Sequence, residues 1–168
     1  ARLFELLHMR DLVERGNEIP LDARVLDSEE REGFRLETLE LRATQGRVIQ
    51  AMVAVPANAA APMPAVVAIH GHGGDRMTPF DPEQGIYKVF GSQLARRGFV
   101  VISTSVGQHE VFEEGRTLMG ERLWDLMRCI DYLRSRDDVD PARIGCAGLS
   151  LGGEMALWIS RDRGVSWT

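Results

Sequence analysis

The residues best suited to chemistry in this chain form a G-x-S-x-G pattern at Gly148–Gly152. The pattern follows the apolar run 143–147 and precedes a helix-like segment, the context in which a serine is held on a tight strand-to-helix turn. Small residues are needed two positions before and after such a serine, because side chains there would clash with neighbouring backbone. We therefore predict Ser150 as a nucleophile, with Gly148 and Gly152 as the glycines of the turn. A glycine-rich turn without a chemical role is the alternative.

A second glycine-rich segment, His70-Gly71-His72-Gly73-Gly74, follows the apolar run 65–69. A tetrahedral acyl intermediate carries negative charge on an oxygen that needs two preorganised N–H donors, and glycines let backbone amides approach it. We expect one donor to be the amide of Leu151, at the positive end of the helix after the serine. The other is the amide of His72 or Gly73. A metal site at the H-x-H pair is disfavoured, because no third ligand has suitable spacing.

Together these motifs resemble the N-terminal two-thirds of an α/β-hydrolase of the dienelactone-hydrolase and acetyl-xylan-esterase-like group. The resemblance runs from about residue 33 to residue 160 and includes the helix phrase 122–126 and the segment 137–145 that leads to the serine. It implies a serine carboxylesterase that works through an acyl-enzyme. Dienelactone hydrolases proper have a cysteine at the turn where this chain has Ser150, so carboxyl-ester hydrolysis is the better expectation.

The order of the triad in such enzymes is serine, acid, histidine, yet only 18 residues follow Ser150 and no histidine is among them. The carboxylates after the serine are Glu154 and Asp162. We therefore interpret residues 1–168 as a single, C-terminally shortened domain or a fragment of a longer protein. His109 is the predicted substitute base, because its loop leaves the same edge of the sheet. A polar surface histidine without a role, or a histidine from another subunit as base, are the alternatives.

Three functions fit the sequence. The first is hydrolysis of small acyl esters. The second is a non-catalytic or weakly active remnant of a hydrolase that binds carbonyl ligands or associates with itself, since a serine without its base keeps little activity. The third is a serine peptidase of the prolyl-oligopeptidase type, which ranks last because the short N-terminal region has no propeller repeats.

Composition excludes several other classes of protein. Hydrophobic residues make up 44% and charged residues 27%, and the net charge of -5 argues against a nucleic-acid binder or an anionic-membrane binder. No apolar run is long enough to span a membrane. Cys129 and Cys146 are expected to be buried and unpaired, which favours a reducing, cytoplasmic location. Hydrolysis of an ester by a serine implies no metal and no organic cofactor, and 145–153 lacks the lysine of a phosphate-binding loop. We therefore expect no cofactor and no metal, with a small-molecule ester as the partner.

The periodicity of the chain predicts an α/β fold. Residues 1–16 form an amphipathic helix that Gly16 ends, and 34–41 and 48–55 alternate as an antiparallel hairpin that opens the sheet. Further strands and helices then follow in alternation, so we expect a curtailed α/β-hydrolase sheet of about five strands, mainly parallel, with helices on both faces. These are strands at 65–69, 99–104 and 143–147 and helices around 86–94 and 123–133. The long loop 105–119 is expected to line the ligand site.

The family order also places the strand before Ser150 at an exposed edge of the sheet, since 161–168 does not resemble the strand that would follow. An apolar edge strand with unpaired amides invites pairing with another chain. We therefore predict a homo-oligomer.

Overall fold

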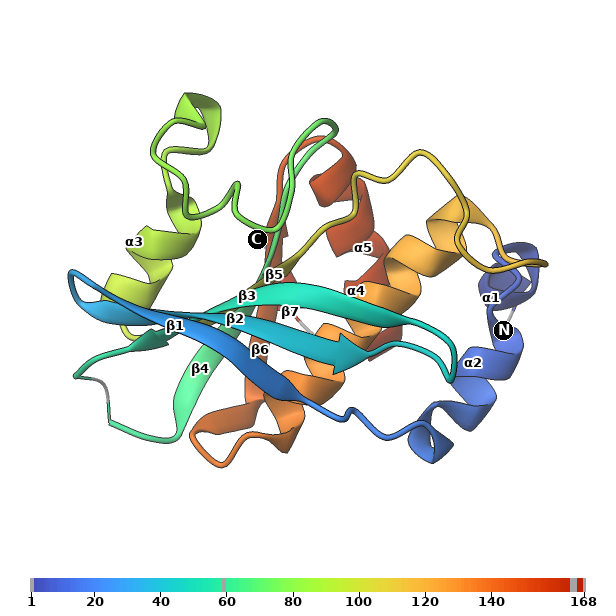
Figure 1. Cartoon of the computed structure of the whole chain (residues 1–168), viewed down its shortest axis with the longest axis horizontal. Coiled ribbons are helices and arrows are strands. Elements are labelled where there is room, and N and C mark those ends of the chain that lie inside the picture. The colour runs from blue at the N-terminus through green and yellow to red at the C-terminus, as the bar shows by residue number, and fades with distance from the viewer. Residues whose placement is uncertain (1, 59, 164–165, 168) are drawn as a thin grey trace.

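The computed structural model describes residues 2–58, 60–163 and 166–167, and its centre is a seven-stranded sheet in the order β1-β2-β3-β5-β4-β6-β7 (Figure 1). The pairs β1-β2, β2-β3 and β3-β5 are antiparallel, and the pairs β5-β4, β4-β6 and β6-β7 are parallel. The strands are β1 (Arg24–Arg31), β2 (Phe34–Arg42), β3 (Val48–Pro56), β4 (Met63–Ile69), β5 (Val100–Thr104), β6 (Val139–Gly148) and β7 (Ser166–Trp167).

The predicted antiparallel hairpin is confirmed, with β2 and β3 paired from Phe34 opposite Pro56 to Arg42 opposite Val48. The sequence analysis missed β1, which pairs with β2 at the edge of the sheet. Its side chains are almost all exposed, and the charged run at its centre shows no alternation of apolar and polar residues. An edge strand with both faces toward solvent carries no period-2 signal, which explains the omission.

The predicted number of strands and the predicted edge are both wrong. The sheet has seven strands, and β6 is not its edge strand, because Ser166 and Trp167 of β7 pair with Gly145 and Cys146 of β6. A two-residue strand is too short to produce a pattern in the sequence. The predicted homo-oligomer depended on that edge, so it stays a prediction without this support.

Helices cover both faces of the sheet, as predicted. On one face α4 (Leu118–Ser135) and α5 (Leu151–Arg163) pack against β4, β5 and β6, and on the other α3 (Phe90–Arg96) packs against β2, β3 and β5. The N-terminal helix predicted over 1–16 is in fact two helices, α1 (Arg2–Leu6) and α2 (Arg10–Arg15). His8 breaks it with a φ of 53°. The helix predicted around 86–94 begins only at Phe90, because Lys88 and Val89 are also left-handed.

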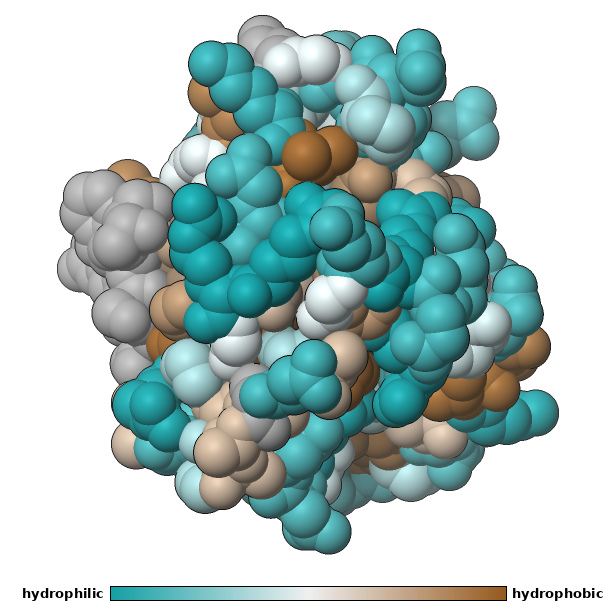
Figure 2. Space-filling model, turned by 90° about the vertical axis from the view of Figure 1, so that its left-hand side faces the viewer, coloured by the Kyte–Doolittle hydropathy of each residue, from teal (hydrophilic) through white to brown (hydrophobic). Residues whose placement is uncertain are grey.

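The largest fully buried side chain belongs to Trp124 of α4, which lies in the core between the helices and the sheet. Its indole Nε1 donates a hydrogen bond to the carbonyl of Ala43 at 2.7 Å, so α4 is fixed to the β2–β3 turn. Cys129 and Cys146 are buried and free, as expected. Figure 2 shows the end of the molecule at which α3 lies, where the surface is mainly hydrophilic and apolar residues form small separate patches. Among the described helices, none has the length and apolar character needed to cross a bilayer.

Candidate active site

Ser150 occupies the sharp turn between β6 and α5, and its backbone has a φ of 56°. This left-handed conformation is rare for a residue with a side chain, and it turns the serine out to solvent. The glycines two positions before and after it are required because a side chain would not fit. A Cβ on Gly148 would lie 2.3 Å from the carbonyl oxygen of Gly152, and a Cβ on Gly152 would lie 2.2 Å from the carbonyl oxygen of Ile69. The strand-turn-helix geometry predicted from G-x-S-x-G is therefore present.

The glycine loop, residues 70–74 after β4, lies directly beside the serine. A Cβ on Gly71 would lie 3.4 Å from the Cβ of Ser150 and 2.7 Å from the hydroxyl of Tyr87. The Gly71 N–H donates to that hydroxyl at 2.6 Å. The sequence analysis missed Tyr87, because a single aromatic residue within the segment predicted as a helix around 86–94 gives no signal of a role at the site.

The predicted oxyanion donors lie on both sides of this contact. Leu151 is the first residue of α5, where backbone N–H groups have no partner within the helix. In the glycine loop, Gly73 is left-handed and the Gly74 N–H bonds to the carbonyl of Gly71 at 3.2 Å, which closes a tight turn. Within the described part of the chain, the amides of Leu151, His72 and Gly73 donate to no other protein group, so they are available to a ligand.

His70 is buried and held at both ring nitrogens. Its Nε2 accepts the N–H of Val106 at 2.9 Å, so the proton lies on Nδ1, which donates to the carbonyl of Gly71 at 2.7 Å. Burial lowers the pKa of the imidazole below its ordinary value. His70 therefore links the glycine loop to the segment after β5 as a neutral side chain and is not placed to act as a base toward Ser150.

The lowered pKa of His70 predicts a loss of stability in mild acid. Above the ordinary histidine pKa of 6.5 the ring is neutral in both the folded and the unfolded chain. As the pH falls below that value, the His70 imidazole binds a proton in the unfolded chain but stays neutral in the folded chain. The free energy of unfolding therefore decreases. Urea unfolding from pH 8 to pH 5 should show a smaller decrease for His70→Gln, whose amide can still accept from Val106. Equal slopes for the two proteins would contradict this account.

His72 and His109 are brought together by the fold. Their rings form an edge-to-face contact with centroids 5.0 Å apart, and both side chains are exposed. The 105–117 loop between β5 and α4 thus lies against the glycine loop, at the edge of the sheet where the sequence analysis expected it. Among the described residues no histidine forms a hydrogen bond with the hydroxyl of Ser150. The structure brings His109 close to the glycine loop but does not pair it with the serine.

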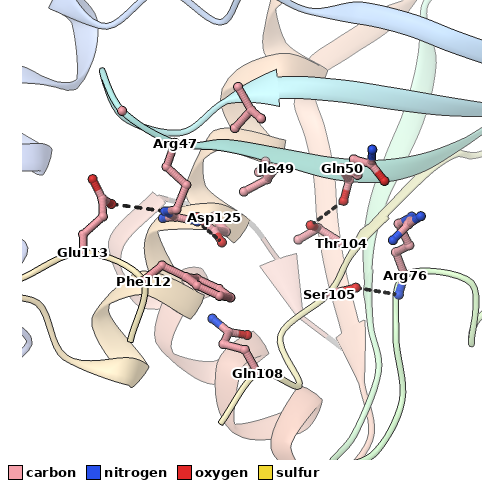
Figure 3. A pocket seen from close by; sticks show the side chains of 12 residues that line it. Arg47, Ile49, Gln50, Arg76, Thr104, Ser105, Gln108, Phe112, Glu113 and Asp125 are labelled. Atoms are coloured by element: carbon pink, nitrogen blue, oxygen red, sulfur yellow. Dashed lines mark hydrogen bonds and ion pairs between the residues drawn. The ribbon is translucent and has the colours of Figure 1, made fainter. Parts of the chain in front are cut away.

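A buried ion-pair cluster, which the sequence analysis also missed, lies farther along the same edge (Figure 3). Arg47 from the β2–β3 turn donates to both carboxylate oxygens of Asp125 in α4, at 2.7 and 2.8 Å, and to Glu113 at 3.1 Å. Burial opposes the charge of Arg47, but the contacts with Asp125 and Glu113 outweigh it and raise the pKa of the guanidinium. Burial raises the pKa of Asp125 to about 6. In the residues that the structure describes, no group of three histidine, cysteine or acidic side chains could hold a metal ion.

Comparison with known proteins agrees with this geometry. The sequence pattern of the prolyl oligopeptidase family matches residues 90–167. A Bacillus subtilis (strain 168) protein named "Putative hydrolase YtaP" is 33% identical over 175 residues, which cover 94% of this chain and 57% of the relative. An acetyl xylan esterase from Paenibacillus sp. R4 superposes with a TM-score of 0.69 at 20% identity, over 90% of this chain and 53% of that one.

A glucuronoyl esterase from Solibacter usitatus superposes with a TM-score of 0.64 at 18% identity, over 86% of this chain and 50% of its own. The chain thus spans about half the length of the proteins it matches. The strand order and these superpositions lead to one conclusion: the chain has the α/β-hydrolase-like fold of these esterases.

Proposed function

We propose that this chain carries the nucleophile and the oxyanion hole of a serine esterase that hydrolyses small acyl esters. The observation that carries the proposal is the left-handed Ser150 between β6 and α5, in contact distance of the glycine loop. The named structural neighbours are esterases, which supports esters over other carbonyl compounds as substrates.

The proposed reaction begins with attack of the Ser150 hydroxyl oxygen on the ester carbonyl carbon. The negative charge that develops on the carbonyl oxygen is stabilised by the amide of Leu151 and by that of His72 or Gly73. When the tetrahedral intermediate collapses, the bond to the alcohol oxygen breaks, and the alcohol leaves with the proton that the serine gave up. Water then attacks the acyl-enzyme, and the acid and the free serine are regenerated.

A base must hold the proton of the Ser150 hydroxyl between the attack on the carbonyl and the departure of the alcohol. We propose His109 for that role within this chain. Its loop lies against the glycine loop through the contact with His72. Both side chains are exposed, so the ring of His109 can turn toward the serine when a substrate is bound. In a His109→Ala variant with an unchanged circular dichroism spectrum, ester turnover should fall at least about 100-fold. Unchanged turnover would exclude His109 as the base and would point to a histidine from another chain segment or subunit.

The activation of Ser150 can be tested with a fluorophosphonate, followed by intact-mass spectrometry. We expect one adduct per chain in the unaltered protein and none in Ser150→Ala, because only an activated serine reacts at a useful rate. Leu149→Ala, which changes the exposed neighbour of the serine, is the matched control and should still be labelled. An unlabelled chain of verified mass would favour a remnant that binds carbonyl ligands without turning them over.

A second candidate function is hydrolysis of peptide-like amides, which the match to the prolyl oligopeptidase family over residues 90–167 favours. The same nucleophile and oxyanion donors would serve both reactions, but the amine leaving group needs protonation more than an alcohol does. An ester and an amide with the same acyl group separate the two functions. Comparable kcat/KM values for the pair would indicate a peptidase, whereas cleavage of the ester alone would indicate an esterase.

A further inference from the structure

A cavity of about 430 Å³ opens beside the end of β5 (Figure 3). Because β5, β4 and β6 are parallel, this is also the edge of the sheet at which β6 leads to Ser150. The walls of the cavity come from the β2–β3 turn, the end of β5 at Thr104, the 105–117 loop and Asp125 of α4. In the sheet β4 lies between β5 and β6, so the end of β5 is two strand spacings, about 10 Å, from the strand that leads to the serine. The volume is in the range of small-molecule sites.

Two polar side chains that line this cavity have atoms without hydrogen-bond partners. Both the oxygen and the nitrogen of the Gln108 amide are buried and unpaired, and so is Nε of Arg76. Across the described residues the Arg76 guanidinium forms no ion pair. Buried polar atoms in folded proteins are nearly always hydrogen-bonded, to protein or to ordered water, so three unpaired atoms around one cavity mark a place for polar partners, which a ligand can supply in place of water.

The charges around the cavity are not equally available. Arg47 is already neutralised by Asp125 and Glu113, which leaves Arg76 as the cation that a ligand can meet. A guanidinium pairs best with a planar carboxylate, through two parallel hydrogen bonds. The two carboxylates opposed by one arginine make the far end of the cavity net negative, which disfavours a doubly charged phosphate. Phe112 and Ile49 supply apolar surface between the two ends.

Two residues that line the cavity adjoin residues of the proposed reaction centre. Arg76 follows the glycine loop, and its backbone N–H donates to the hydroxyl of Ser105 at 3.1 Å. Gln108 precedes His109, whose ring touches that of His72. A substrate that spans Ser150 and the cavity would therefore have to pass these two histidines.

We propose that the cavity is the site for the alcohol portion of the ester, and that it selects alcohols that carry a carboxylate. Arg76 pairs with the carboxylate and the Gln108 amide completes its hydrogen bonds. The alcohol portion is assigned because a small acyl group would leave most of about 430 Å³ empty. This inference rests on the proposed esterase function.

The kinetic test compares the acetate ester of 3-(4-hydroxyphenyl)propanoate with that of the corresponding amide, which is similar in size but uncharged. We expect kcat/KM to favour the acid about tenfold or more, as hydrogen bonds to a charged group do. In Arg76→Gln and in Gln108→Leu the ratio of kcat/KM for the acid to kcat/KM for the amide should fall toward one. Arg24→Gln, at an exposed position on β1, is the matched control and should keep it.

A binding test separates this inference from the proposed function. Calorimetric titration of Ser150→Ala with 3-(4-hydroxyphenyl)propanoate and with its amide needs no turnover. Preferential binding of the acid that is lost on adding Arg76→Gln supports the carboxylate site, even if no ester is hydrolysed and the esterase proposal fails. Ester hydrolysis without preference for the acid, together with equal or absent binding of both compounds, overturns the carboxylate site and leaves the esterase proposal intact.

Discussion

Gly152→Ala is expected to destabilise the protein by about 3 kcal/mol or more and to abolish labelling of Ser150. The added Cβ would lie 2.2 Å from the carbonyl oxygen of Ile69 and 2.7 Å from that of His70. Both atoms belong to the backbone at the end of β4, which is hydrogen-bonded to β5 on one side and β6 on the other. Because β4 is held on both sides, it cannot shift away from the added methyl group. Helix α5 must therefore move away from the sheet, and the turn that carries Ser150 moves with it.

Urea unfolding and fluorophosphonate labelling measure these two effects. Gly153→Ala is the matched control, since a Cβ there would meet no atom closer than 3.5 Å. It lies in α5, where alanine is preferred over glycine by up to about 1 kcal/mol, so stability should be unchanged or higher. Equal stability of the two variants would show that the close approach of Gly152 to β4 does not constrain the turn.

Arg47→Met is expected to cost about 3 to 5 kcal/mol, the usual penalty when one partner of a buried ion pair is removed. The Asp125 side chain is only 4% exposed and would lose both of its contacts with the guanidinium. Burial already raises its pKa to about 6, and loss of the cation raises it further. The unpaired carboxyl can be kept neutral in mild acid, so the destabilisation should be smaller at pH 5 than at pH 8.

Chemical denaturation at the two pH values measures this effect. Arg42→Met is the control in the same hairpin, because the Arg42–Asp22 ion pair is exposed and should contribute less than about 1 kcal/mol. Adding Asp125→Leu to Arg47→Met should restore much of the loss, since the buried charge is then gone. If the Arg47 and Arg42 variants were equally stable at pH 8, the cluster would not support the fold.

The parts of the fold that follow from local pattern were predictable from the sequence. The hairpin, the buried strands of the parallel sheet and the turn at Ser150 are encoded by alternation, apolar runs and glycine spacing within ten or so residues. Strand β1 was not predictable, because an exposed edge strand has no buried face and so needs no alternation of apolar and polar residues.

The contacts that complete the site depend on residues distant in the chain. Arg47 and Asp125 are 78 positions apart, and each by itself reads as an ordinary charged residue of a turn or a helix. Tyr87 meets Gly71 only because the segment after the glycine loop folds back over it. Such pairs can be identified only once the topology is known, since the local sequence does not indicate which distant residue is the partner.

The hydrogen bond from the Val106 amide to His70 has a consequence for how this protein can diverge. It ties the base of the 105–117 loop to the glycine loop, so a substitution that shifts Val106 would also shift the amides that are proposed to hold the oxyanion. Changes beyond Val106, at Gln108 and onward, leave that tie in place. Relatives that acquire new substrates should therefore vary Gln108 and the part of this loop beyond His109, and preserve its first residues and the proposed base, so that substrate selectivity changes while the rate of the chemical step is retained.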